Sequence, residues 1–115
     1  MNIKAHQVGN KKIAEVIADS VLIHSPEDAL QLLVDLYYQE FDKVIIQEKN
    51  IIPSFFDLKT GIAGELLQKF SNYRMQLAII GNFSQYSGKS IKDFIYESNK
   101  GKLVNFLSSV QEALD

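Results

Sequence analysis

The segment Lys43–Phe70, KVIIQEKNIIPSFFDLKTGIAGELLQKF, decides the fold of this chain. It opens with Val44-Ile45-Ile46, an apolar β-branched run that is too short for a helix and typical of a strand buried on both faces. A polar stretch follows, and after Pro53 an apolar pattern with helical spacing continues to Phe70. A strand, a loop and a helix in this order are typical of an α/β domain, which commonly binds its ligand or partner at such a loop.

The helix in this segment can begin at either of two places. Ser54 as N-cap, with Asp57 three residues later, predicts a long helix whose apolar residues stay in register. Alternatively, residues 55–59 form a loop and Thr60 caps a shorter helix. Gly61 inside the longer helix costs about 1 kcal/mol relative to alanine, and Gly64 costs the same in either version. The periodicity favours the longer helix.

The residues before this segment predict a hairpin and a helix. Strands are expected over 3–8 and 12–18, joined by the turn pair Gly9-Asn10. Residues 21–23 either extend the second strand or lead into the next helix. That helix has a clear start, because Ser25 suits the N-cap position and Pro26 the first helical position.

The residues after the segment predict two more strands, each followed by a helix. Strands are expected over 76–81 and 103–107. Ser90 with Asp93 resembles a capping box for the first helix, and Ser108 or Ser109 can cap a short final one. The order β-β-α-β-α-β-α-β-α predicts a single α/β domain over residues 1–115. Its layered fold holds a mixed sheet of about five strands and about four helices.

Composition excludes several classes of protein. Of the 115 residues, 46% are hydrophobic and 23% are charged, which fits one folded domain. The net charge is -2 and no basic stripe is present, so nucleic-acid binding is not expected. No apolar run approaches the ~20 residues that span a bilayer, and we expect no membrane association. There is no cysteine and no secretory segment at the N-terminus, and a cytoplasmic protein is the expectation.

Several motifs that suggest chemistry fail on inspection. Gly88-Lys89-Ser90 is similar to the end of a phosphate-binding loop, but Phe83 occupies the position of the required first glycine. His6 and His24 lie far apart in the sequence, and no serine sits in a nucleophile elbow. We therefore expect no catalytic residue, no metal site and no cofactor.

The polar residues that follow the central strands form the candidate binding surface. In open α/β sheets, ligands and partners meet the carboxyl ends of parallel strands. A simpler interpretation is that these are solvated charges and helix caps. The residues expected on a partner or ligand surface are Glu48, Lys49, Asn50, Asp57, Lys59, Thr60, Gly61, Asn82 and Ser84. Tyr86 also follows the strand over 76–81 and is expected at the same edge of the sheet.

With Thr60 near a helix start, the order of elements resembles the STAS domain (sulfate transporter and anti-sigma antagonist). That resemblance implies a phosphorylatable Ser or Thr at the start of the second helix, and Thr60 is the residue in that place. STAS antagonists usually carry Asp-Ser-Ser/Thr-Gly there. In Leu58-Lys59-Thr60-Gly61 this chain keeps Thr-Gly and lacks Asp-Ser, with Asp57 displaced upstream.

At the level of sequence, the segments FFDLKTGIAGELLQKFSNYR and KDFIYESNKG are similar to characteristic stretches of a family of small bacterial proteins, domain of unknown function 4180. The similarity runs from near residue 11 to the C-terminus. It implies no particular activity.

Two functions follow as competing hypotheses. The first is a non-enzymatic regulatory domain of STAS-like build that docks an unidentified protein partner and is switched by phosphorylation of Thr60. The second is a small-molecule binder or simple enzyme that uses the same surface, with Glu48 or Asp57 as acid/base and Lys59 as an anion clamp. Self-association as a homodimer is a third hypothesis, and its candidate anchors are Tyr37, Tyr38 and Tyr86.

Overall fold

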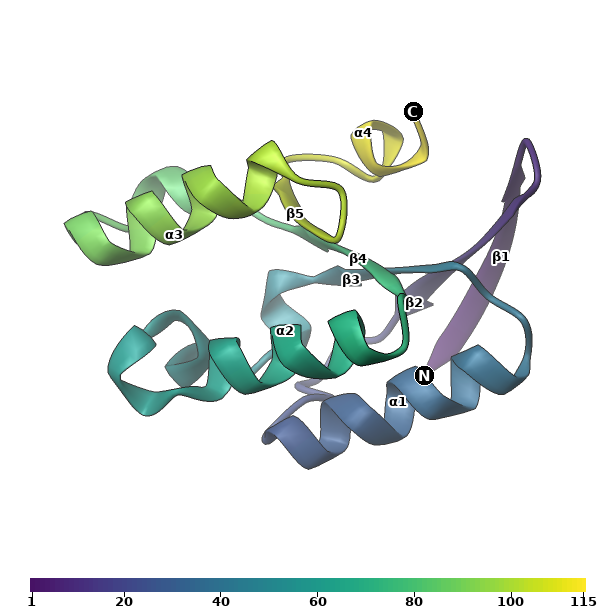
Figure 1. The fold of residues 1–115 in the computed structure, drawn as a ribbon, viewed down its shortest axis with the longest axis horizontal. Helices are drawn as coiled ribbons and strands as arrows, with labels where there is room; N and C mark the ends of the chain where they lie inside the picture. Colours follow the sequence, from purple (N-terminus) through teal and green to yellow (C-terminus); the bar gives the residue numbers. More distant parts are fainter.

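A mixed sheet of five strands in the order β1-β2-β3-β4-β5 runs through the molecule, in a computed structural model that describes residues 1–115 (Figure 1). The first two strands form an antiparallel hairpin, and every later neighbouring pair is parallel. The strands are β1 (Asn2–Val8), β2 (Lys11–Ile17), β3 (Lys43–Gln47), β4 (Gln76–Ile80) and β5 (Val104–Leu107). The predicted α/β fold with a mixed sheet of about five strands and about four helices is confirmed.

Three of the four helices cover one face of the sheet (Figure 1). Because β2, β3, β4 and β5 are neighbours in chain order, right-handed crossovers place the connecting helices on the same side. The fourth helix packs on the opposite face, where Ala113 contacts Ile45 and Ile80. The helices are α1 (Pro26–Tyr38), α2 (Ile62–Asn72), α3 (Lys89–Lys100) and α4 (Val110–Leu114). No helix combines the length and apolar character needed to cross a bilayer.

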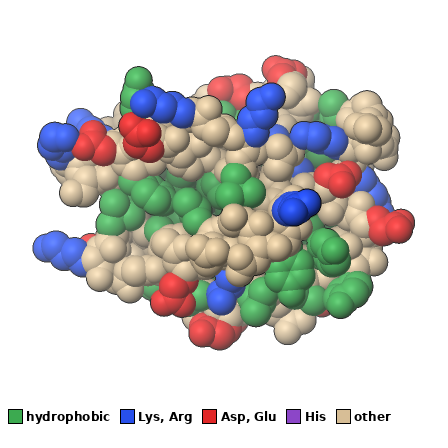
Figure 2. Space-filling model, in the orientation of Figure 1, with side chains coloured by type: hydrophobic (Ala, Val, Ile, Leu, Met, Phe, Trp, Pro, Cys, Tyr) green, Lys and Arg blue, Asp and Glu red, His purple; other side chains and the backbone are tan.

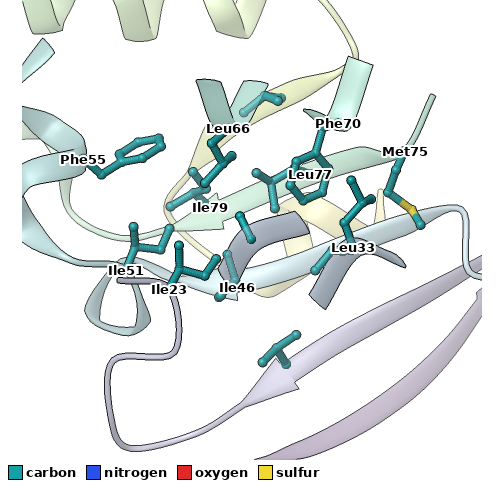
Figure 3. Close-up of a cluster of buried hydrophobic side chains, with 14 of the residues drawn as sticks. Ile23, Leu33, Ile46, Ile51, Phe55, Leu66, Phe70, Met75, Leu77 and Ile79 are labelled. Atoms are coloured by element: carbon teal, nitrogen blue, oxygen red, sulfur yellow. The ribbon is translucent and has the colours of Figure 1, made fainter. Parts of the chain in front are cut away.

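The core lies between the sheet and the first three helices (Figure 3). Ile46 and Leu77 point from the sheet toward Leu66 and Phe70 of α2. Alternation along β3 sends Ile45 to the other face, under α4. All three apolar residues of β3 are 0% exposed, as expected for a strand buried on both faces.

The long helix predicted to begin at Ser54 is wrong. Two short 3₁₀ turns, η2 (Pro53–Phe56) and η3 (Leu58–Thr60), replace its first half. Gly61 then adopts a φ of 77°, which ends any helical run before α2 begins at Ile62. Folding the chain back here buries Phe55 and Phe56 together, with ring centroids 4.8 Å apart. The shorter alternative, with a loop before Thr60, describes the structure better, but Gly61 and not Thr60 occupies the N-cap position of α2.

Of the caps predicted for the other three helices, two are confirmed and one is wrong. Ser25 caps α1 and Ser109 caps α4 through their side-chain oxygens. The helix α3 begins two residues earlier than expected, with Gly88 as its N-cap. Asp93 pairs with Lys89 at 2.6 Å and does not complete a capping box with Ser90. The segment 21–23 joins neither neighbour; it runs beside Ile51 in a single parallel bridge.

Candidate functional site

The carboxyl ends of β3 and β4 lie side by side. Their parallel register places Gln47 next to Ile80, so the loops that follow the two strands leave the sheet at the same end. The loop after β3 covers residues 48–61 and starts with the 3₁₀ turn η1 (Glu48–Asn50). The loop after β4 covers residues 81–88 and contains the turn η4 (Phe83–Gln85). We refer to them as the β3 loop and the β4 loop.

Glu48 ties these two loops together. Its carboxylate accepts a hydrogen bond from Gln85 Nε2 at 2.9 Å and another from the Tyr86 hydroxyl. Burial, together with this carboxylate, raises the pKa of Tyr86 well above its usual value, so the phenol stays a donor. The close approach of the Glu48 side chain to the β4 loop requires a glycine at position 81. A Cβ atom there would lie 2.4 Å from Glu48 Oε1 and 2.8 Å from Glu48 Cβ. The contact is therefore built into the backbone of the β4 loop.

Aromatic rings form the base of both loops. Phe56 of the β3 loop stacks on Tyr86 of the β4 loop, with centroids 4.9 Å apart and an interplanar angle of 19°. Phe83 meets Phe106 of β5 edge-to-face at 5.2 Å. These contacts anchor the loops to the core, and such pairs contribute about 0.5–1.5 kcal/mol beyond burial of their area.

The turn from Asp57 to Gly61 is held by its own backbone. Asp57 Oδ1 accepts from the amide of Lys59 at 3.2 Å. The Thr60 hydroxyl lies 2.9 Å from each of two carbonyl oxygens to which it can donate, those of Ser54 and Asp57. It also accepts from the amide of Ile62, at 3.3 Å. All four predicted residues of this turn are exposed, but the Thr60 hydroxyl is engaged with the chain itself.

A shallow hollow of about 210 Å³ separates this turn from the start of α3. Its apolar lining comes from Phe56, Leu58 and Ile91, and its polar lining includes Asp57 and Lys59. Figure 2 shows apolar side chains gathered in a depression between α3 and the segment that carries η3 and α2. Asp57 and Lys59 of the β3 loop thus face the beginning of α3 across an apolar floor.

A larger open hollow, of about 640 Å³, lies at the carboxyl ends of β4 and β5. The connections after these two strands diverge, since α3 covers one face of the sheet and α4 the other. Asn82 and Ser84 line it, and Asn82 Oδ1 accepts from the Ser84 hydroxyl at 2.6 Å. Glu112 lines its far side, and hydrogen bonding from the Ser108 hydroxyl lowers the pKa of this carboxyl.

Asn50 does not belong to the exposed surface, and its prediction as a surface residue is wrong. The side chain is 0% exposed and donates to the carbonyls of Ala18 at 3.0 Å and Ser20 at 2.9 Å. It therefore holds the β3 loop against the segment that follows β2. Its neighbour Lys49 is exposed and lines a third hollow of about 260 Å³, together with Glu48, Phe56 and Tyr86.

Each histidine pairs with one carboxylate. His6 Nε2 lies 2.8 Å from Glu15, and His24 Nδ1 lies 3.3 Å from Asp28. No three His, Asp or Glu side chains gather as they would around a metal ion.

Two residues of this site, Gly81 and Phe56, were absent from the prediction, whereas Tyr86 was expected at this edge of the sheet. Gly81 and Tyr86 complete the Glu48 contact, and Phe56 supplies the apolar floor. A glycine directly after a buried strand was a usable signal for Gly81, because it often marks a close approach by another group.

Comparison with known proteins gives a family. Residues 8–115 match the family model described as Domain of unknown function (DUF4180). The chain belongs to the DUF4180 family. No curated protein and no solved structure matched in the same comparisons. The segment FFDLKTGIAGELLQKFSNYR lies within the matched residues and covers the end of η2, η3, Gly61 and α2.

Proposed function

We propose that this DUF4180 protein is a non-enzymatic regulatory domain of STAS-like build that binds a protein partner. The docking surface consists of residues 57–61 of the β3 loop together with the β4 loop. Its setting is the bacterial cytoplasm, in keeping with the bacterial family it resembles and its cysteine-free sequence.

The observation that carries this proposal is the hollow between η3 and α3. Phe56, Leu58 and Ile91 give it an apolar floor, while Asp57 and Lys59 stand at its edge. Protein interfaces combine an apolar centre with a polar rim in the same way. At about 210 Å³ the hollow is smaller than the ~300–1,000 Å³ of typical small-molecule pockets, and its size suits one anchoring side chain of a partner.

Phosphorylation of Thr60 would change this surface strongly. A phosphate removes the hydroxyl proton that Thr60 now directs at the carbonyls of Ser54 and Asp57. It also adds about -1.5 to -2 charges beside those carbonyl oxygens, which repel it. The turn must then open, while the amide of Ile62 at the start of α2 stays available to the phosphate. Modification would thus reshape the rim next to Lys59.

The test is affinity capture from bacterial lysate with matched baits. The wild-type chain is expected to retain a protein that Lys59→Glu and Thr60→Glu release, because both place negative charge on the docking surface. Lys102→Glu is the control for Lys59→Glu, since it makes the same charge change in the exposed turn between α3 and β5. Retention of identical proteins by all four baits would contradict the proposal.

A small-molecule binder is the second candidate, favoured by the hollow of about 640 Å³ between the ends of β4 and β5. The connections diverge there to opposite faces of the sheet, and open α/β folds bind ligands at such points. The carboxylate of Glu112 lines the hollow, and no lysine or arginine does, so a cationic or neutral ligand would fit best. Thermal-shift screening with small amines and with organic acids tests this candidate: stabilisation by an amine, lost in Asn82→Leu, would support it. An unchanged melting temperature with both the amines and the organic acids would exclude this candidate.

A further inference from the structure

The two edge strands of the sheet, β1 and β5, differ in whether other parts of the chain cover them. On β5, Asn99 of α3 bonds both backbone groups of Phe106, accepting from its amide at 2.7 Å and donating to its carbonyl at 3.1 Å. Ser98 donates to the carbonyl of Val104 at 2.5 Å. These are outward-facing groups, because the inward carbonyls of residues 103 and 107 accept from the β4 side. Side chains of α3 therefore occupy the outer edge of β5, and another strand cannot pair there.

The outer edge of β1 is open. The hairpin pairs all seven residues of β1, from Asn2 opposite Ile17 to Val8 opposite Lys11, without a bulge or a proline. Around a two-residue turn, Val8 and every second residue before it bond to β2, so Ile3, Ala5 and Gln7 direct their amides and carbonyls outward. Figure 1 shows no element beyond β1 at this margin. Such an edge is a template for pairing with another strand.

We propose that β1 pairs with β1 of a second copy of this chain, antiparallel and about a two-fold axis at Ala5. This register uses every outward-facing group, with Ala5 opposite Ala5 and Ile3 opposite Gln7 of the second copy. The two sheets then form one continuous sheet, and both copies keep α1 on the same side. A two-fold axis makes the contact self-complementary and closed.

The side chains on this edge suit that register. The small Ala5 side chains meet at the axis and leave room for close pairing of the two backbones. On one face, Lys4 lies beside His6 of the second copy in this register. Lys4 also lies opposite Glu15 on β2 of its own chain, and this Glu15 is 2.8 Å from His6 of the same chain. Each lysine is thus matched by one carboxylate, and no like charges meet unopposed.

Two further features of the hairpin favour an added strand. Only residues 13–15 of β2 pair with β3, so most of the hairpin's length is paired by its own two strands alone. Two-stranded hairpins are marginal on their own, and a third strand stabilises them. The exposed large apolar side chains other than tyrosine also gather here: Met1 is 69%, Val8 40% and Ile17 46% exposed.

The chain contains no cysteine, so single-cysteine variants test the register directly. Opposed hydrogen-bonded residues have Cα atoms about 5.5 Å apart, within disulfide range, and Ala5→Cys is expected to form a linked dimer almost completely under mild oxidation. The matched control is Gln7→Cys on the same edge. Its two copies would lie about 14 Å apart in this register and should link only weakly by themselves, but efficiently when mixed with Ile3→Cys.

Sedimentation of the wild-type chain completes the test. A dimer is expected at micromolar concentrations, and Ala5→Pro should convert it to a monomer with unchanged circular dichroism, since an edge strand tolerates proline where its amide points outward. Equal crosslinking of Ala5→Cys and Gln7→Cys, or a wild-type chain that sediments only as a monomer, would overturn the proposal.

Discussion

Replacing Gly81 with alanine tests the contact that joins the β3 and β4 loops. The new methyl group would lie 2.4 Å from Glu48 Oε1 and 2.8 Å from Glu48 Cβ. Rotation of the carboxylate can relieve the first clash, but the second requires η1 itself to move. Overpacking of this kind costs about 1–3 kcal/mol, and displacing Glu48 also weakens its hydrogen bonds to Gln85 and Tyr86 at about 1 kcal/mol each. We expect a total destabilisation of about 2–4 kcal/mol.

The assay is thermal unfolding followed by circular dichroism. For a chain of this size the expected loss corresponds to a melting temperature lower by roughly 8–16 °C. Gly64→Ala is the matched control: nothing lies within 4 Å of its added Cβ, and alanine at this exposed position in the first turn of α2 should stabilise by at most about 0.5–1 kcal/mol.

A double-mutant cycle locates the effect. In a Glu48→Gly background both clashing atoms are gone, and Gly81→Ala should then cost less than about 1 kcal/mol. The proposed role of Glu48 would be refuted if Gly81→Ala had the melting temperature of the wild type. It would also be refuted if Gly81→Ala lost the same stability in the wild-type and Glu48→Gly backgrounds.

Three other predictions concern single residues. Asn50→Ala removes the buried amide that donates to the carbonyls of Ala18 and Ser20, and it should lower the free energy of unfolding by about 1–3 kcal/mol in urea titration; an unchanged midpoint would show that this amide does not hold the loop. Glu48→Gln should lower the raised pKa of Tyr86 only part of the way to its ordinary value, since burial is the larger cause of the shift. The pKa is measured by tyrosinate absorbance, with Tyr86→Phe as the reference. The raised pKa favours the neutral phenol, so this stabilisation is present below the ordinary pKa of 10.0 and is lost as pH rises. Glu112 has a lowered pKa, so its stabilisation is present above 4.5 and is lost as pH falls; the melting temperatures of wild type and Glu112→Gln should therefore converge in acid, and a constant difference would contradict this.

The sheet could be predicted from the sequence because its signals are local. The run Val44-Ile45-Ile46 predicts a strand buried on both faces without reference to the rest of the chain. Ser25 and Ser109 cap their helices through neighbours within three residues. Strands separated by helices then fix the parallel order by the handedness of crossovers.

The turn before α2 could not be predicted in the same way. Phe55 fits helical spacing with Leu66 and Phe70, and it is also buried in the folded-back turn that occurs instead. Periodicity does not separate these two ways of burying one ring. The deciding feature is the positive φ of Gly61, a conformation that its sequence neighbours do not reveal.

The candidate site was predictable in its place but not in its contacts. The adjacent tips of β3 and β4 follow from strand order, and they bring Glu48 to the β4 loop. The burial of Asn50 and the stacking of Phe56 on Tyr86 depend on how separate loops pack, and residue type alone does not encode that packing.

The most direct test of the docking surface is hydrogen–deuterium exchange of the protein with and without the partner captured by the wild-type bait. Binding across both loops should slow exchange in residues 57–61 and 82–88 together and leave the turn around Lys102 unchanged. Protection confined to one loop, or found only at the other end of the sheet, would contradict a shared surface.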